Sequence, residues 1–188
     1  SSDVYKERLT TIRNQQKQMI KQDIAASGNT DWTVNNNKAK GRKMVNDMKK
    51  LLLRAFNSEC DETIGKVKYN NIETSVRKIV KSAEQIQKLG TIMSVYINQS
   101  YIDLKIVELY LAFEYQQKKQ QEKEEQRELR AQQREEAKLK KEIEEKRKKI
   151  KKEQTHYQQA LKNLLSQIKE HGETEDLIAK KAELETEL

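Results

Sequence analysis

Apolar residues recur at intervals of three and four over most of the first 90 residues, which is the pattern of amphipathic helices. Such a helix is predicted over 4–24, and a second is predicted from the asparagine run at 35–37 to about Gly65. A third helix is predicted over 72–90. Glycine and polar residues interrupt the pattern at 27–29, where we expect a loop, because glycine favours helix ends.

A fourth helix is predicted to begin after Asn98, whose side chain is suited to cap the free amides of a helix start. Its first part, from Tyr101 to Tyr115, is apolar on nearly every face. Since a helix that is apolar all round is buried on all sides, we expect this segment at the centre of the core, wrapped by the three preceding helices. The β-branched stretch 91–97 before it is compatible with an extended chain.

The composition changes abruptly at Gln116. Residues 116–153 contain 15 basic and 10 acidic side chains and only a few apolar ones. Many are Glu and Lys four residues apart, in the order that stabilises isolated helices by about 0.2–0.5 kcal/mol per pair. No glycine or proline interrupts the run, so the fourth helix is predicted to continue to His171, a length of about 110 Å at 1.5 Å per residue. We interpret 116–142 as a mostly solvated stalk.

Beyond the stalk, four apolar positions recur at intervals of seven residues, which suggests the seam of a coiled coil. These positions are Ile143, Ile150, Tyr157 and Leu164. Between them, Lys146 and Glu153 stand where a coiled coil prefers leucine. We therefore expect pairing with a partner helix to be favoured only from Ile143 onward.

Gly172 breaks the helical pattern, and Thr174 is placed to cap a last helix. A connection this short is within the usual range for neighbouring antiparallel helices. The chain is therefore predicted to fold back as a hairpin. Folding back would place Leu177 near Ile168, Leu184 near Leu161 and Leu188 near Tyr157.

These elements predict an all-α fold with a small core of about four helices, one very long helix that extends into a charged stalk, and a C-terminal helical hairpin. We expect a helical core domain over 1–115, the stalk over 116–153, and a coiled-coil hairpin or oligomerisation tail over 154–188. The composition agrees, because the 188 residues include no proline and five glycines, whereas the turns of β-sandwiches are rich in both.

Several classes of protein are excluded by the same composition. No apolar run approaches the roughly 20 residues of a membrane span, and a single cysteine excludes an internal disulfide. No signal or transit peptide opens the chain. Because its first residue is Ser1 rather than methionine, we expect the chain to be a segment of a longer protein.

The net charge of +8 favours an acidic partner such as DNA or an anionic membrane surface. It divides into +6 over 1–115, +5 over 116–153 and −3 over 154–188. Helix starts rich in Lys and Arg suit phosphates, because free amides and positive side chains converge there. The candidate phosphate contacts on the second helix are Lys38, Lys40, Arg42, Lys43, Lys50 and Arg54. The alternative is a solvated helix face that happens to be basic.

No constellation of catalytic or metal-binding residues is recognisable in the sequence. Cys60 has no histidine near it in the chain, and a nucleophilic thiol needs a neighbour that lowers its pKa. The two histidines, His156 and His171, lack acidic or thiol partners at ligand spacing. We therefore expect no enzymatic activity, no metal and no cofactor.

Two further features of the expected core are singular. Trp32 is expected either to pack over the edge of the core or to anchor a partner or a base. The segment from Arg54 to Asp61 has a more complex pattern of polar residues than an ordinary amphipathic helix. We interpret it as a buried polar network that fixes the second helix against the third, in which Arg54 pairs with Glu59, Asp61 or a neighbouring helix.

Two motifs carry a resemblance to a known family. The first comprises Arg54-Ala55-Phe56-Asn57, Glu59-Cys60-Asp61, Ile64, Val67 and Asn70-Asn71. The second comprises Glu114-Tyr115-Gln116, Lys118, Lys119, Glu122, Lys123, Glu124, Glu125, Gln126 and Arg127. Over roughly residues 5–170, the chain thereby resembles a bacterial and phage domain of unknown function that commonly precedes a GIY-YIG nuclease domain.

The resemblance implies a role in defence against phage. The family includes membrane-associated anti-phage nucleases, of the type called surface-associated nucleases inhibiting phage entry, in which an N-terminal anchor precedes the helical domain and the nuclease follows it. Val95-Tyr96-Ile97 does not supply the nuclease strands or their catalytic residues. The resemblance therefore implies a non-catalytic segment in the bacterial cytoplasm, held at the inner face of the membrane only by a segment outside this chain.

The leading hypothesis is that the core over 1–115 binds DNA or senses a phage injection or tail component. In that hypothesis the long helix holds a nuclease domain at a fixed distance. The alternative is a structural coiled-coil scaffold that forms homo-oligomers through the long helix and binds no nucleic acid. These two hypotheses can be distinguished by where the positive charge lies on the protein.

Overall fold

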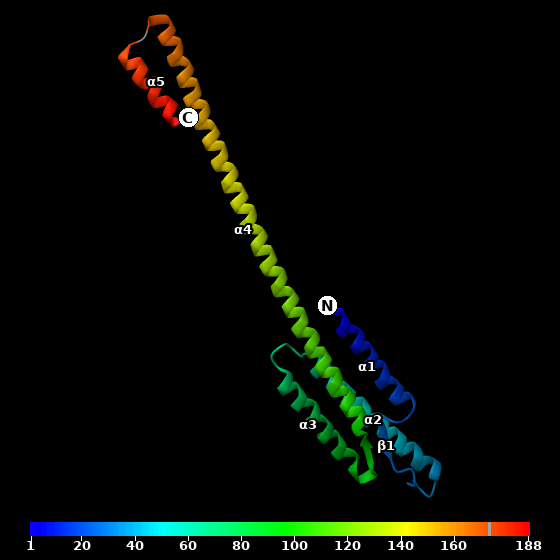
Figure 1. Ribbon diagram of the computed structural model, residues 1–188. Coiled ribbons are helices and arrows are strands. Elements are labelled where there is room, and N and C mark those ends of the chain that lie inside the picture. The colour runs from blue at the N-terminus through cyan, green and yellow to red at the C-terminus, as the bar shows by residue number, and fades with distance from the viewer. Residues whose placement is uncertain (173) are drawn as a thin grey trace. The chain divides into compact units, whose positions relative to one another are not determined.

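The computed structural model describes residues 1–172 and 174–188. Its described part contains the α-helices α1 (Asp3–Lys21), α2 (Lys38–Gly65), α3 (Ile72–Gly90), α4 (Gln99–His171) and α5 (Glu175–Glu187). A 3₁₀ turn, η1 (Thr91–Met93), and the short strands β1 (Ala26–Gly28) and β2 (Val95–Ile97) lie between them (Figure 1). The predicted all-α fold with one very long helix is confirmed.

The described residues divide into two compact units, 1–125 and 126–188, and α4 contributes to both. The boundaries expected from composition, after residues 115 and 153, remain predictions. As predicted, α4 runs without a break through 73 residues. Among the helices of the described residues, none is long and apolar enough to span a membrane.

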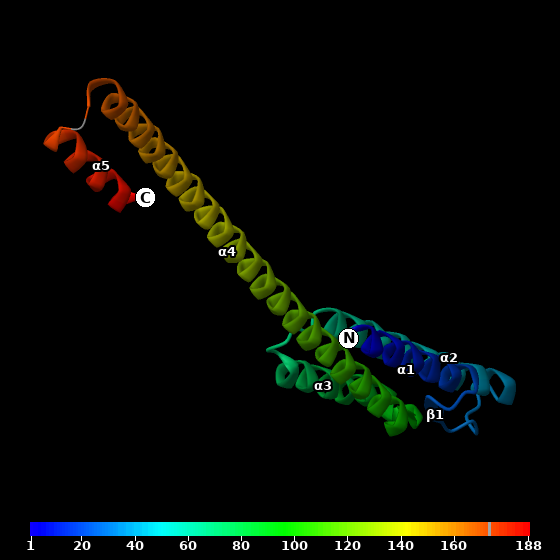
Figure 2. The ribbon, with the colours of Figure 1, turned by 45° about the horizontal axis from the view of Figure 1, so that its top comes forward.

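In the first unit, α1, α2 and α3 lie alongside the first part of α4 (Figures 1 and 2). The large side chains at the centre of its core come from α2, α3, β2 and α4. The most completely buried are Val45, Phe56, Cys60, Ile79, Val95, Ile97, Tyr101 and Leu109. The apolar stripes predicted for α2 and α3 therefore face one shared core, with the start of α4 across from them.

The connection after α1 differs from the expected loop. α1 ends at Lys21 rather than at residue 24, because Asp23 adopts a positive φ of 57° that turns the chain. The residues that follow form β1, which pairs antiparallel with β2 so that Ala26 lies opposite Ile97. Only the last part of 91–97 is thus extended. Strands of three residues are too short to show an alternating pattern in the sequence.

Asparagines shape the helix starts, with one difference from expectation. Asn35 and Asn36 adopt positive φ angles of 50° and 61°, which asparagine tolerates better than most residues. Asn37 caps α2 by accepting the backbone N–H of Lys40 at 3.1 Å. The side chain of Asn98 does not cap α4 but bonds to the carbonyl of Ile24 and the hydroxyl of Ser27, which ties the helix start to β1.

The first part of α4 is not buried on all sides, contrary to prediction. Val107 and Tyr110 are 42% and 45% exposed, because α1, α2 and α3 cover only part of the circumference of the helix. On the covered side, Lys105 and Glu108 are buried at 5% and 3% exposure. The apolar pattern was therefore misleading, since two charged residues face the core and two apolar residues face water.

In the second unit, α4 ends at His171 and the chain turns back, as the predicted hairpin requires (Figures 1 and 2). Gly172 has a φ of +80°, and the side chain of Thr174 accepts the backbone N–H of Leu177 at 3.4 Å. Leu164 of α4 is buried at 7% exposure. The other partly covered apolar side chains of this unit are Tyr157, Ala160, Leu161, Ile168, Leu177 and Leu184.

Candidate interaction surface

A cluster of charged and polar side chains lies buried between α1, α2 and α4. Its centre is the carboxylate of Glu108, which accepts hydrogen bonds of 2.9 Å from Arg13 Nε and from Gln16 Nε2. Lys105 Nζ lies 3.5 Å from that carboxylate and 3.8 Å from Asp61. Burial opposes the charge on Glu108, but the hydrogen bonds and positive neighbours outweigh it and hold the pKa of this carboxyl below its usual value.

The polar motif predicted on the second helix faces this cluster. Asn57 accepts a hydrogen bond from the hydroxyl of Tyr101, and Asp61 pairs with Lys105. Asn57 and Asp61 thus join a polar network as predicted, but it fixes α2 to α4 rather than to α3, because helical periodicity does not identify the neighbour that a face meets. The predicted pairing of Arg54 with Glu59, Asp61 or a neighbouring helix is wrong, since Arg54 is exposed and forms no ion pair among the described residues. Burial raises the pKa of the Cys60 thiol and of the Tyr101 hydroxyl to about 12.

The charged groups of this cluster compensate one another, and its described residues do not form an arrangement typical of a catalytic or metal-binding site. Within residues 1–172 and 174–188, every buried side-chain nitrogen and oxygen has a hydrogen-bond partner. The same residues include no group of three His, Cys, Asp or Glu side chains placed to hold a metal ion. His156 and His171 both lie exposed on α4. A partner is therefore expected to bind at the surface rather than at this cluster.

All six basic residues predicted to contact phosphate are exposed on α2. Four of them recur at intervals of three, seven and four residues and so share one face of the helix. These are Lys40, Lys43, Lys50 and Arg54. The other two, Lys38 and Arg42, lie four residues apart on a different face. The structure thus brings four of the predicted residues together and separates two from them.

The surroundings of these residues determine which charges are available. Lys43 pairs with Asp47 at 2.6 Å, and this hydrogen bond lowers the pKa of the Asp47 carboxyl. Among the described residues, none of the other five basic side chains forms an ion pair with an acidic one. Because Asn37 already accepts the N–H of Lys40, the amides at this helix start are less available to phosphate than the sequence suggested.

Trp32 packs at the edge of the core, where its indole N–H donates to the carbonyl of Met93 at 3.1 Å. Its side chain is half-buried. The backbone of the same loop runs directly over Gly41 of α2, and a Cβ at that position would overlap the carbonyl of Trp32. Gly41, which lies among the basic residues of α2, therefore allows this loop to pack closely against the helix.

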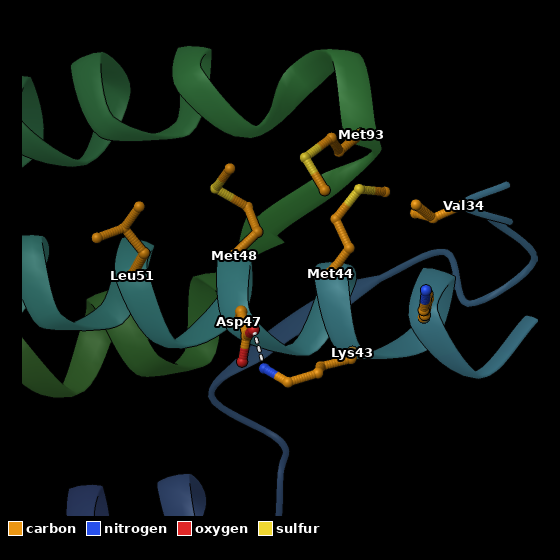
Figure 3. A pocket seen from close by; sticks show the side chains of 8 residues that line it. Val34, Lys43, Met44, Asp47, Met48, Leu51 and Met93 are labelled. Atoms are coloured by element: carbon orange, nitrogen blue, oxygen red, sulfur yellow. Dashed lines mark hydrogen bonds and ion pairs between the residues drawn. The ribbon is translucent and has the colours of Figure 1, made fainter. Parts of the chain in front are cut away.

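An apolar groove opens beside the basic face, between α2 and η1, and holds about 480 Å³. Figure 3 shows Met44 and Met48 rising from α2 on the same side as Met93. The full lining is Val34, Lys40, Lys43, Met44, Asp47, Met48, Leu51 and Met93. Met44, Met48 and Leu51 recur at intervals of four and three residues, and from this spacing alone they look like core residues of the second helix. The signal against this interpretation is that the apolar positions of this helix are spread too widely for a single face.

The predicted seam on the long helix is only partly open. Ile143 and Ile150 are 46% and 56% exposed, whereas Tyr157 is half-buried and Leu164 is 7% exposed. Leu164 is thus already covered within its own unit and is not free for a second chain. Whether any of the four contacts a partner remains a prediction.

Residues 2–120, more than half of the chain, match the family described as the SNIPE associated domain. No curated protein and no solved structure matches the chain. The matched residues include all of α1, α2 and α3, both strands and the part of α4 that carries the buried cluster.

Proposed function

This chain belongs to the SNIPE associated domain family, a nuclease-associated helical module, and from that premise we propose that it is the non-catalytic part of an anti-phage defence nuclease. In this proposal residues 1–125 recognise DNA or a phage injection or tail component, and α4 connects them to a GIY-YIG nuclease domain. The protein works in the bacterial cytoplasm, at the inner face of the membrane where a separate segment anchors it. The chain itself contributes no catalytic group and no cofactor.

The observation that supports DNA binding most is the basic face of α2. Lys40, Lys43, Lys50 and Arg54 extend over four turns, with Asp47 as the acidic residue between them. A row of cations on one exposed helix face suits the regular phosphates of a DNA backbone. Since Lys43 is paired with Asp47, the net attraction comes mainly from the other three residues. Such contacts position a protein on DNA without reading its sequence.

The test is a salt titration of binding to a short DNA duplex, followed by fluorescence anisotropy. The variant combines Lys50→Glu with Arg54→Glu, two exposed residues whose substitution leaves the core intact. We expect weaker binding at every salt concentration. The slope of log affinity against log salt should fall by about 1 for each phosphate that the variant no longer neutralises.

The matched control combines Lys162→Glu with Lys169→Glu, two exposed lysines of the second unit. It lowers the net charge of the chain by the same amount as the test variant. Binding by the control should therefore resemble that of the original protein. If both variants lose affinity equally, the attraction is a property of the net charge and the assignment to α2 is wrong.

A second candidate function, a coiled-coil oligomerisation scaffold, is favoured by the exposure of Ile143 and Ile150. It predicts a dimer whose fraction rises with concentration in light scattering, and which is lost on Ile150→Asp combined with Leu164→Asp. Because Leu164 is buried within its own unit, Ile143→Asp with Ile150→Asp tests the seam more directly. A monomer at all concentrations would reject this function.

The proposal that the chain lacks catalysis has its own measurement. The purified protein is incubated with plasmid, linear and single-stranded DNA in the presence of Mg²⁺ or Mn²⁺. We expect all three substrates to remain intact. DNA cleavage activity that co-purifies with the protein would overturn the proposal.

A further inference from the structure

The apolar groove on α2 lacks a covering element in the described part of the chain. It is lined by three of the four methionines of the protein, Met44, Met48 and Met93. Methionine side chains are flexible and polarisable, so surfaces rich in them adapt to apolar side chains of different shapes. A groove of about 480 Å³ lies within the usual size range of binding sites.

Large apolar side chains next to the groove face water. Leu51, in its lining, is 58% exposed, and Ile92, which directly precedes Met93, is 88% exposed. Leu89, at the end of α3, is 74% exposed. Leu89 and Ile92 are three residues apart at the junction of α3 and η1. Exposed apolar residues of this kind beside an apolar groove mark a surface that binds another macromolecule.

The local backbone conformation holds Ile92 in its exposed position. η1 is a single 3₁₀ turn, and Ser94, which follows it, has a left-handed φ of 53°. The carbonyl of Met93 is held by the indole of Trp32. The exposure of Ile92 therefore comes from an anchored turn between α3 and β2.

The charges around the groove determine the kind of partner that it fits. Its charged lining residues are Lys40, Lys43 and Asp47, and Asp47 is neutralised by Lys43 at 2.6 Å. Lys50 and Arg54 continue the positive face along the same helix. A partner that inserts apolar side chains here therefore meets positive charge at its edge, and its own flanking charge must be negative.

We propose that this groove binds an acidic amphipathic helix of a protein partner. From Met44 to Leu51, α2 advances by seven residues, about 10 Å. Apolar residues at i, i+3 or i+4, and i+7 of a partner helix span the same distance, which is the usual arrangement of a helix in an apolar groove. A DNA duplex fits this site less well, since its phosphates gain nothing from methionine and leucine side chains.

The test uses the full chain and a fluorescent synthetic peptide of about 15 residues, because shorter peptides are poorly helical. The peptide carries leucines at i, i+3 and i+7 and mostly glutamates elsewhere. A second peptide has lysines in place of the glutamates. We expect the acidic peptide to bind and the basic peptide to bind at least about tenfold more weakly, a difference that salt reduces.

The variant Leu51→Glu with Ile92→Glu changes two exposed side chains and should leave thermal unfolding unchanged. Binding of the acidic peptide should weaken by about tenfold or more, since two apolar side chains no longer pack against it and two repulsive charges are added. The matched control is Leu129→Glu with Leu139→Glu on α4, because these leucines are 54% and 57% exposed and the two substitutions add the same two negative charges. This control should bind the peptide normally. Leu51→Glu alone, at the residue of the two that lines the groove, serves if the double variant unfolds.

Four results would overturn the proposal, and the first three concern the peptides. They are failure of the acidic peptide to bind, equal binding of both peptides, and binding that is unaffected by Leu51→Glu with Ile92→Glu. A fourth is a duplex whose affinity falls with these apolar substitutions as much as that of the peptide, which would make DNA the occupant. Because Lys50 and Arg54 stay intact in this variant, failure here is distinguishable from failure of the DNA-binding proposal.

Discussion

Glu108 carries its charge at a position that is 3% exposed. Such a charge is tolerated only where partners replace the lost water, and here Arg13, Gln16 and Lys105 do so. These side chains are long and mobile in an unfolded chain, so ordering them costs entropy. The cluster is therefore better understood as a device that selects one packing of α1 against α4 than as a large net source of stability.

Removing the charge of Glu108 leaves buried Lys105 with only the more distant carboxylate of Asp61, at 3.8 Å, among the acidic groups of the cluster. Glu108→Gln should lower the free energy of unfolding by about 3 kcal/mol, because the charge of Lys105 stays buried. The measurement is urea unfolding followed by circular dichroism. Its matched control is Glu128→Gln, an exposed glutamate on the same helix, which should change stability by less than about 0.5 kcal/mol. A loss of similar size in both variants would show that the cluster has no special role.

The same residue makes stability depend on pH. The folded-state pKa of Glu108 lies below its unfolded value, which is about 4.3. Its contribution is therefore complete above that value and is lost as the pH falls through the folded-state pKa. Between pH 7 and pH 3, the original protein should lose more stability than Glu108→Gln does. Parallel curves for the two proteins would contradict this.

Gly41 is the position where α2 tolerates no side chain. Gly41→Ala should destabilise the protein by about 2 kcal/mol, because the added Cβ must push the loop at Trp32 away from the helix. Gly65, near the end of the same helix, has nothing within 4 Å of an added Cβ. Gly65→Ala should therefore leave stability unchanged or raise it by about 0.5 kcal/mol. Thermal unfolding of both variants decides the matter, and equal effects would refute the close approach.

At the scale of elements, the turn between α4 and α5 depends on a single backbone conformation. Gly172 has a φ of +80° and open space around it. Gly172→Ala should therefore cost only the left-handed strain, about 1 kcal/mol. Amides of α5 should exchange with solvent about fivefold faster, measured by mass spectrometry, while those of α2 stay unchanged. Unchanged exchange in α5 would mean that the hairpin does not depend on this turn.

The sequence was sufficient for the elements that have strong local signals. Helical spacing placed α2 and α3, and the lack of glycine and proline together with the Glu–Lys pairs placed the full length of α4. The asparagine run at 35–37 marked a start, and Gly172 marked a reversal. β1 gave no such signal, and the β-branched stretch 91–97 indicated only that the chain at β2 could be extended, because each strand has three residues and its partner lies about 70 residues away. Local pattern does not encode a pairing at that separation.

The candidate sites show the same limit. The exposed basic residues of α2 could be identified from the sequence, since charge and exposure usually coincide. Lys105 and Glu108 could not, because buried charges look like surface residues until their partners Arg13 and Gln16 are known. The groove was missed for the opposite reason, since Met44 and Met48 look like core residues.

At the scale of the whole molecule, residues 1–125 have their own core and their own polar cluster. The chain start is also fixed within this unit, because Glu122 accepts the backbone N–H of Ser2 at 2.9 Å. We therefore expect a protein of residues 1–125 to unfold cooperatively on heating, at a temperature close to that of the full chain. Circular dichroism and calorimetry measure this, and a broad, non-cooperative transition would show that the unit needs residues 126–188.

The bond between Ser2 and Glu122 joins residues 120 positions apart in the chain. A ribosome adds about 5–20 residues per second, so the first helix waits about 6–24 s for its last partner. An isolated helix forms in about a microsecond, so helix formation does not set the pace. During synthesis α1, α2 and α3 emerge with their apolar faces uncovered, and the unit closes only when α4 arrives. Chaperone dependence in the cell should therefore track the time taken to translate the first part of α4.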